Sequence, residues 1–453
     1  MKRSMKLLGS AFVVSIAMIA CESDDQELMP DMMDLKTANN GMIKSYGSAV
    51  VLQWNEAVSL AVDTRMPPPP EARSYAMVSL AVHDALNNVV PKYESYALGN
   101  TDVDYKDVSK KNIHSIADAA VAQAAHDVMV ALVPASAANA GSLLSSCLAA
   151  IEESDLKTRG IQIGKDAALA ILTERQSDPP LRFAAYPQGT EPGEYKSPMP
   201  YAVSNGVWPD NSAYAPDLGS FRPFGVASSD QFRAEPPYPL NSPEYAADYN
   251  EVMNLGGEFS TERTPGQAEM GVFFLDNVAS SINRVARFMA VQEGLDGWET
   301  ARLLALTHIA QFDAAQSSFE GKYHYNRWRP ITAITAGDID GNDDTAGDPS
   351  WIILKAARAT PPTPTYPSTH AEMGAAGAEI LKLFFKKDNL PYTIGSYALP
   401  GIERSYESFS EFATEVSVSR IYIGFHFRND IVQGHKMGKK LANYVFENNL
   451  RKL

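Results

Sequence analysis

The chain has 453 residues, enough to bury a large core, and its formal net charge at neutral pH is −15. Such an acidic chain is not expected to bind nucleic acid or an anionic membrane surface. It contains only two cysteines, so no disulfide framework is expected and stability must come from the core.

The N-terminus has the pattern of an export signal. Three basic side chains precede an apolar run, so residues 1–20 are interpreted as a signal peptide rather than as part of the fold. The run is too short for a stable transmembrane helix, and Met-Ile-Ala-Cys resembles a lipoprotein cleavage box with Cys21 as the acylated first residue. We expect a lipoprotein of a Gram-negative outer membrane, on its periplasmic or cell-surface side. Polar residues 21–47 then predict a flexible tether.

Residues 48–176 predict helices only. Apolar residues recur at helical spacing in five segments, which are Val50–Val62, Ala72–Val90, Ile113–Leu132, Ala138–Glu152 and Thr158–Arg175. Their alanine-rich faces are typical of closely packed helix pairs. His83 and Asp84 lie among apolar neighbours in the second segment, so we interpret them as structural.

Residues 177–244 lack this periodicity and are rich in proline, tyrosine, glycine and asparagine. The segment is too long for an ordinary connection within a compact domain. Because its aromatic side chains provide apolar area, we expect it to wrap the surface and to cover part of a functional site.

Residues 245–453 return to helical patterns, with segments predicted at Tyr245–Asn254, after Thr264 and at Trp298–Phe319. Asp313 is interpreted as a carboxylate on the helix surface. The aspartate-rich loop at residues 338–348 resembles a calcium loop only superficially, because its glycine occupies the fourth position and no glutamate closes it. Calcium is therefore not predicted there.

The stretch Ser419–Asp430 combines a cation, an imidazole and a carboxylate. If the chain is helical from His426 onward, the Asp430 carboxylate lies on the same face and can accept a hydrogen bond from one ring nitrogen of His426. The other nitrogen then presents a lone pair, which suits a metal ligand or a nucleophile. Arg420 adds a permanent cation whose forked shape matches tetrahedral oxyanions.

A second stretch supplies two more cations. Lys322 and Arg329 would lie two turns apart on one face of a helix, where both can bind one anion. Pro330 is expected to end that helix, because proline cannot continue it.

A third stretch, Pro-Ser-Thr-His, precedes an alanine-rich helical pattern and predicts a helix start. Thr369 and Glu372 have the spacing of a capping box. A helix N-terminus offers free backbone N–H groups to an anion, Ser368 adds a hydroxyl, and His370 would stand directly over the anion.

Together these stretches read Lys-x6-Arg-Pro, Pro-Ser-x-His and Ser-Arg-x5-His-x3-Asp. In this order they resemble the signature shared by vanadium-dependent haloperoxidases and type 2 phosphatidic acid phosphatases. Trp54, the Pro67–Pro70 run and the helical pattern after it also look like the N-terminal half of soluble bacterial haloperoxidase-like proteins. The chain departs from the family at Thr369, where glycine is usual, and the added side chain could narrow the pocket.

The resemblance implies one all-α domain over residues 48–453, a helical bundle whose three motifs converge on a single pocket. It implies vanadate as the cofactor, with His426 as the metal ligand, and a catalytic set of His370, His426 and Asp430. The groups that would bind the oxyanion are Lys322, Arg329, Ser368, Thr369, Arg420 and His426. Phosphate could occupy the same site.

Two reactions fit these residues. With vanadate bound, hydrogen peroxide would oxidise a halide while His370 moves protons. Without it, His426 would attack a phosphoester and form a phosphohistidine, as in an acid phosphatase. We favour the haloperoxidase, because lipid phosphatases of this superfamily are membrane-embedded and no segment after the signal is long enough to span a membrane.

Two points refine this expectation. A lipoprotein that only binds an anion would need neither both histidines nor Asp430, so it ranks last. The residue seven before His370 differs among family members of different halide preference, and here it is Thr363, which leaves the halide open.

Overall fold

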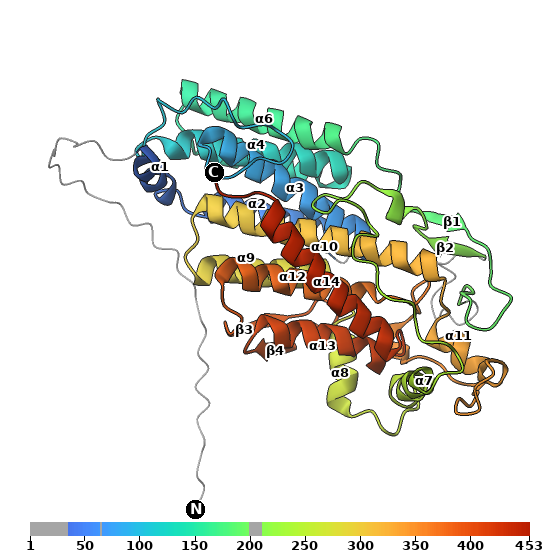
Figure 1. The fold of residues 1–453 in the computed structure, drawn as a ribbon. Coiled ribbons are helices and arrows are strands. Elements are labelled where there is room, and N and C mark those ends of the chain that lie inside the picture. The colour runs from blue at the N-terminus through green and yellow to red at the C-terminus, as the bar shows by residue number, and fades with distance from the viewer. Residues whose placement is uncertain (1–34, 64–65, 199–210) are drawn as a thin grey trace, which may run out of the picture.

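The computed structural model describes residues 35–63, 66–198 and 211–453 (Figure 1). The expected signal peptide, Cys21 and the first part of the expected tether lie outside these residues. The helices are α1 (Leu35–Lys44), α2 (Ala49–Val62), α3 (Pro68–Val89), α4 (Ile113–Leu132), α5 (Ala137–Ala149), α6 (Asp155–Glu174), α7 (Pro243–Gly256), α8 (Pro265–Phe273), α9 (Val278–Gln292), α10 (Gly297–Tyr325), α11 (Pro330–Thr335), α12 (Thr369–Phe385), α13 (Phe409–Tyr422) and α14 (Arg428–Asn448).

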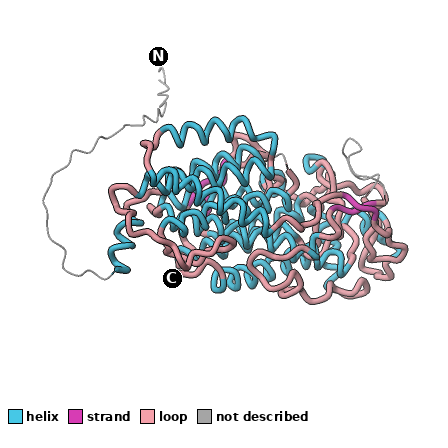
Figure 2. Tube along the Cα trace, turned by 90° about the horizontal axis from the view of Figure 1, so that it is seen from above, coloured by secondary structure: helices cyan, strands magenta, loops and turns pink. Residues whose placement is uncertain are grey.

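Short strands complete the described fold. Strand β1 (Phe183–Ala185) pairs antiparallel with β2 (Ser212–Tyr214), and β3 (Tyr392–Gly395) pairs antiparallel with β4 (Glu403–Tyr406). Much of the irregular chain lies at one end of the helices, together with the β1–β2 pair (Figures 1 and 2). The all-α expectation is confirmed, because neither pair of strands builds a core sheet.

Helix α10 lies at the centre of the fold. Helix α3 packs on one side of it and is followed by α4 and α6, while α12 packs on the other side and is followed by α13 and α14 (Figure 1). One large cluster of buried apolar side chains runs through both sides. The N-terminal helices and the C-terminal helices therefore share a single core.

The five helices predicted in the first half are present, with ends that differ by a few residues. The pattern after Thr264 is not one continuous helix, however. Helix α8 ends at Phe273 and α9 begins at Val278, with Asn277 in an extended conformation as its N-cap. The apolar spacing continues across this break, so periodicity alone did not reveal it.

The second part of the expected tether belongs to the fold. Residues 35–44 form α1, and Met42, Ile43 and Tyr46 are buried. The Tyr46 ring packs edge-on against Trp298 at the start of α10, with ring centroids 5.5 Å apart. These contacts bury apolar area that the polar composition of the segment did not indicate.

The irregular segment packs down onto α10 through Asp313. This side chain is 1% exposed, and its carboxylate accepts hydrogen bonds from the backbone N–H groups of Phe224, Gly225 and Val226 at 2.6–3.1 Å. Burial raises the pKa of Asp313 to about 6, which the three donors oppose. The expectation of a surface carboxylate was wrong, because Asp313 anchors the segment that wraps the surface.

Helices α12 and α14 approach closely because α14 presents glycine to its neighbour. A Cβ atom at Gly438 would lie 2.2 Å from the Glu372 carbonyl oxygen, and one at Gly434 would lie 2.5 Å from the Ser368 carbonyl oxygen. The close approach lets the Ser368 N–H donate to the Asp430 carbonyl at 3.0 Å. Two of the three predicted motifs are thus joined by backbone.

His83 and Asp84 are structural, as predicted. His83 Nε2 lies 3.0 Å from the Glu94 carbonyl, and Asp84 accepts from three consecutive backbone N–H groups at residues 96–98.

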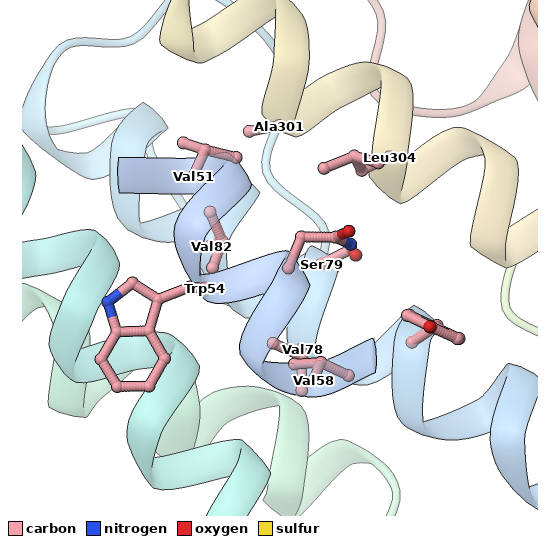
Figure 3. Close-up of a pocket in the computed structure, with 10 residues that line it drawn as sticks. Val51, Trp54, Val58, Val78, Ser79, Val82, Ala301 and Leu304 are labelled. Atoms are coloured by element: carbon pink, nitrogen blue, oxygen red, sulfur yellow. The ribbon is translucent and has the colours of Figure 1, made fainter. Parts of the chain in front are cut away.

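Nearby, a cavity of about 10 Å³ lies between α2, α3 and α10 and has mainly apolar walls that include Trp54 and Ser79 (Figure 3). It holds about one water molecule at most. No helix in the described part of the chain is long and apolar enough to cross a membrane.

Candidate active site

A larger cavity, of about 390 Å³, lies where the loops gather near the C-terminal end of α10. Side chains from all three predicted motif stretches line it, namely Lys322, Arg329, Thr369, His370 and His426. Three stretches that are distant in the sequence therefore meet at one space within the helical domain.

The two cations of the first stretch reach the cavity by different routes. Lys322 lies in the last turn of α10, which ends at Tyr325 with Asn326 in the left-handed conformation. Arg329 precedes α11 in an extended conformation, and Pro330 is the first residue of that helix. The expectation of one helical face ended by Pro330 was wrong, because proline at a first helical position begins a helix.

Both cations are held by backbone carbonyls. The Lys322 ammonium donates to the carbonyls of Pro364, Thr365 and Pro367 at 2.6–3.0 Å. The Arg329 guanidinium donates to the Phe425 carbonyl at 3.0 Å, and its Nη1 lies 3.2 Å from His426 Nε2. These bonds fix the positions of two permanent donors inside the protein.

His426 is oriented by Asp430. Helix α14 begins at Arg428, so His426 precedes the helix, yet its Nδ1 lies 3.0 Å from Asp430 Oδ2. The same carboxylate oxygen accepts from the Phe427 N–H at 3.1 Å and from the Thr365 hydroxyl at 2.5 Å. The predicted His–Asp contact is present without the predicted helix. With the Nδ1 proton donated to Asp430, Nε2 carries the lone pair.

His370 lies in the first turn of α12. Ser368 is the N-cap, with its hydroxyl oxygen 3.5 Å from the Ala371 nitrogen, so the predicted capping box of Thr369 and Glu372 is not formed. The Thr369 hydroxyl is instead 2.8 Å from the Ser318 hydroxyl of α10. His370 Nε2 is buried and has no hydrogen-bond partner among the described residues.

Two predicted anion-binding residues, Arg420 and Ser368, are buried but do not line the cavity. The Arg420 guanidinium donates from Nε to the Ser419 hydroxyl at 3.0 Å and from Nη2 to the Gly271 carbonyl at 3.2 Å. Its charge still acts on the site, since it lowers the pKa of both His370 and His426.

Comparison with known proteins shows which family this chain is similar to. Residues 302–453 match the family model described as the VCPO second helical-bundle domain. The vanadium chloroperoxidase of Curvularia inaequalis is 25% identical, over 85% of this chain and 80% of that protein. These two matches support membership in the vanadium haloperoxidase superfamily.

Solved structures of the superfamily share its fold. A bacterial vanadium-dependent iodoperoxidase superimposes with a TM-score of 0.70 at 22% identity, over 90% of this chain and 97% of that one. A bacterial vanadium-dependent chloroperoxidase gives a TM-score of 0.67 at 16% identity, over 86% and 93% of the two chains. At these identities the likeness concerns the fold.

The electrostatics of this haloperoxidase-type site follow from burial among cations. Desolvation, followed by Arg329 and Lys322, holds the pKa of His426 well below its usual value, and desolvation followed by Arg420 does so for His370. Desolvation likewise lowers the pKa of Lys322. Burial raises the pKa of Asp430 to about 6, with the Thr365 hydroxyl and the cations opposing. Both histidines are therefore neutral at neutral pH.

The residues present fit a tetrahedral oxyanion such as vanadate. They combine an imidazole lone pair at His426 Nε2, two fixed cations and a second buried imidazole nitrogen without a partner.

Within the described residues no group of three or more His, Cys, Asp or Glu side chains could hold a metal ion. In the loop at 338–348, the Asp340 carboxylate accepts from the Thr345 hydroxyl at 2.7 and 2.9 Å.

Two threonines of the proline-rich run before α12 belong to the site and were not fully recognised from the sequence. Thr365 contacts both Asp430 and His426, with its hydroxyl 3.2 Å from His426 Nδ1. Thr363, singled out only for halide preference, accepts from Arg329 through its carbonyl at 2.7 Å and its hydroxyl at 2.8 Å. The signal was a run of hydroxyl residues alternating with prolines directly before the Pro-Ser-Thr-His stretch.

Proposed function

We propose that this protein is a vanadium-dependent haloperoxidase, which oxidises a halide with hydrogen peroxide. The observation that carries the proposal is His426, whose Nδ1 is held by Asp430 while its Nε2 lies beside a fixed cation in a cavity. This arrangement suits a single imidazole ligand to a metal oxyanion, with a carboxylate that fixes the tautomer of that ligand.

Each residue of the site has a distinct part. Lys322 and Arg329, whose side chains are buried, hold negative charge at the cavity wall, and buried Arg420 contributes positive potential from behind that wall. Vanadate, when bound at His426, would activate peroxide as a Lewis acid. Neutral His370, with its free Nε2, can accept a proton and return it.

The second candidate is an acid phosphatase. The same His426 geometry suits a nucleophile, because Asp430 stabilises the positive charge that the imidazole acquires when Nε2 attacks phosphorus. His370 would then protonate the leaving alcohol.

Vanadate separates the two candidates by the sign of its effect. For a haloperoxidase, apo-protein gains iodide or bromide oxidation only when vanadate and peroxide are both supplied, and excess phosphate suppresses this gain. For a phosphatase, vanadate inhibits hydrolysis of a soluble phosphomonoester, because it mimics the transition state. Nitrate at equal ionic strength controls for salt. Vanadate-inhibited hydrolysis without any halide oxidation would overturn the proposal.

We also propose export as a lipoprotein anchored at Cys21 to the outer membrane of a Gram-negative bacterium. The support is the basic start, the apolar run and the small residues before Cys21. Wild-type protein should fractionate with membranes and carry an acylated N-terminal residue by mass spectrometry. Cys21→Ser should lose both properties, and an unmodified Met1 in the wild type would contradict the proposal.

A further inference from the structure

The active-site cavity reaches the surface along a wall that loops and short strands build. Several lining residues there are only half-buried, among them Phe183, Tyr214, Ala359 and Pro361, and we call this edge the mouth. Few charged residues directly adjoin a lining residue in the sequence. They are Arg182, Asp276, Glu320 and Arg358. The surroundings of the cavity thus hold two acids and two bases.

The two acids are paired, whereas the two bases are not. Glu320 accepts from the Arg233 guanidinium, with one hydrogen bond at 2.9 Å, and buried Asp276 forms an ion pair with Arg284. The two arginines that adjoin the lining are exposed, and neither forms an ion pair with a described carboxylate. The mouth therefore carries two positive charges without a partner, on a chain whose formal net charge is −15.

The two arginines belong to segments that meet at strand β2. The Ala215 N–H, directly after β2, donates to the Arg182 carbonyl at 2.8 Å, and the Tyr214 N–H of β2 donates to the Pro362 carbonyl at 2.9 Å. Pro362 follows Arg358 in the loop before α12. Backbone hydrogen bonds thus fix both segments against the same strand.

The backbone at Arg358 is strained. Its φ of 66° and ψ of −58° lie in a region that residues with a side chain rarely adopt. The Ala359 N–H donates to the Ala357 carbonyl at 2.8 Å, which closes a three-residue turn around Arg358. Glycine would occupy this turn without strain. Strained positions cluster at functional sites, where the surrounding structure holds a side chain in a required place.

We propose that Arg182 and Arg358 form an anion-capture site at the mouth, which concentrates small inorganic anions and passes them to Lys322 and Arg329. A unit charge about 5 Å from an anion in water raises the local anion concentration about 4-fold at low ionic strength, and two such charges act together. Capture of an oxyanion is independent of any reaction, whereas delivery of a halide substrate rests on the proposed haloperoxidase function.

Oxyanion capture is tested first, on the full chain without vanadate, by calorimetric titration with inorganic phosphate. At about 20 mM ionic strength, the double variant of Arg182→Ala and Arg358→Ala should bind phosphate about 3- to 10-fold more weakly than the wild type. At about 0.5 M the difference should shrink below about 2-fold, because salt screens exposed charges. Lys355→Ala is the matched control. Lys355 lies in the same short turn, is exposed and pairs with Glu258 at 3.8 Å, so phosphate affinity should not change.

Two further variants separate the charge of Arg358 from its backbone conformation. Arg358→Lys keeps the charge and should bind phosphate like the wild type. Arg358→Gly removes the charge and relaxes the turn, and it should bind phosphate as weakly as Arg358→Ala. Wild-type phosphate affinity of Arg358→Gly would show that the arginine acts only through the shape of the loop, and would remove it from the capture site.

Halide delivery is tested with vanadate, hydrogen peroxide and bromide. The double variant should lower kcat/KM for bromide about 3- to 10-fold at low ionic strength and leave kcat at saturating bromide unchanged. The KM for hydrogen peroxide should also stay the same, because peroxide is uncharged and does not respond to the two arginines. An unchanged kcat/KM for bromide would overturn halide delivery.

The outcomes separate this proposal from the proposed function. Equal phosphate affinity of the wild type and the double variant at low ionic strength would overturn the capture site. A loss of phosphate affinity that salt does not reduce would also overturn it, because exposed charges are screened. Salt-dependent loss of phosphate affinity in a protein that oxidises no halide would instead overturn the haloperoxidase function and leave the anion-capture site standing.

Discussion

Helix α10 has buried polar side chains at two positions along its length, a first level at His308 and a second level at Lys322. The two levels differ in how the buried polar groups are hydrogen-bonded. His308 lies midway along the helix, with Nδ1 2.8 Å from the Ser79 hydroxyl and Nε2 3.1 Å from Asn283 Oδ1. Its ring stacks on Tyr75, and burial lowers its pKa to about 3. About four turns further on, Lys322 lies beside the active-site cavity.

The histidines beside the active-site cavity, His370 and His426, are paired differently from His308. His370 Nε2 lacks a partner in the described part of the chain, and His426 Nε2 lies beside the Arg329 guanidinium. Near His308 the adjoining cavity is about 10 Å³, whereas the site cavity is about 390 Å³. Burial and a lowered pKa therefore do not mark a functional histidine. A ring nitrogen that faces space and cations does.

The largest effect should separate these two kinds of histidine. His426→Ala removes the ligand or nucleophile, so turnover in whichever assay is positive should fall about 10³-fold or more, while the cations that bind the anion remain. His308→Ala should lower the free energy of unfolding by a few kcal/mol, because it leaves Ser79 and Asn283 unpaired, and should spare turnover per folded molecule. Unchanged turnover of His426→Ala would remove it from the mechanism.

A smaller effect should follow from loosening His426 without removing it. Asp430→Asn keeps the shape but no longer stabilises a charged imidazole, so turnover should fall about 10- to 100-fold. Thr365→Val, which removes one hydroxyl from the same carboxylate, should fall between wild type and Asp430→Asn. Both variants should retain the thermal midpoint of the wild type within a few degrees. Wild-type activity of Asp430→Asn would make this carboxylate purely structural.

Helical periodicity predicted most of the fold, and failed where tertiary contacts override local patterns. The segments from Val50 to Arg175 were recognisable because each keeps one apolar face. Asp313 was misplaced, because a carboxylate that anchors three backbone N–H groups looks like a surface residue in the sequence. Pro330 was misread as a stop, because proline marks either a helix end or a helix start.

The site could be predicted as a set of residues but not as a geometry. Spacing suggested that His426 meets Asp430, and the contact exists although His426 lies outside the helix. Spacing could not show that Arg420 lies behind the cavity wall, nor that Thr365 shares the Asp430 carboxylate. Those facts depend on where loops cross, which no local pattern records.

Glu372 is a buried side chain without a hydrogen-bond partner that does not line the active-site cavity, so its replacement should affect stability rather than turnover. It is 0% exposed, its carboxyl oxygens lack hydrogen-bond partners among the described residues, and burial raises its pKa well above 4.5. The folded state therefore holds this proton where the unfolded chain has lost it, so stability falls as pH rises above about 4.5. Glu372→Gln should remove that loss.

The expected gain in unfolding free energy for Glu372→Gln is about 1–2 kcal/mol at pH 8 and close to zero at pH 4, measured by denaturant titration at both values. Turnover should change little. Glu379→Gln is the matched control on the same helix, because Glu379 already pairs with Lys382 at 3.3 Å. Equal pH dependence in wild type and Glu372→Gln would show that Glu372 is ionised in the folded protein.

The smallest effect concerns Thr369, where the family usually has glycine. Its hydroxyl bonds to Ser318 of α10, and the residue also lines the cavity, so Thr369→Gly both breaks a bond and widens the space. Ser318→Ala breaks the same bond without widening the space. If width limits the site, Thr369→Gly should raise the apparent affinity for vanadate a few-fold while Ser318→Ala does not. If the hydrogen bond to α10 matters instead, both variants should lose about 1 kcal/mol of unfolding free energy and should bind vanadate with equal affinity. The affinity is measured by adding vanadate to the apo-protein in competition with phosphate.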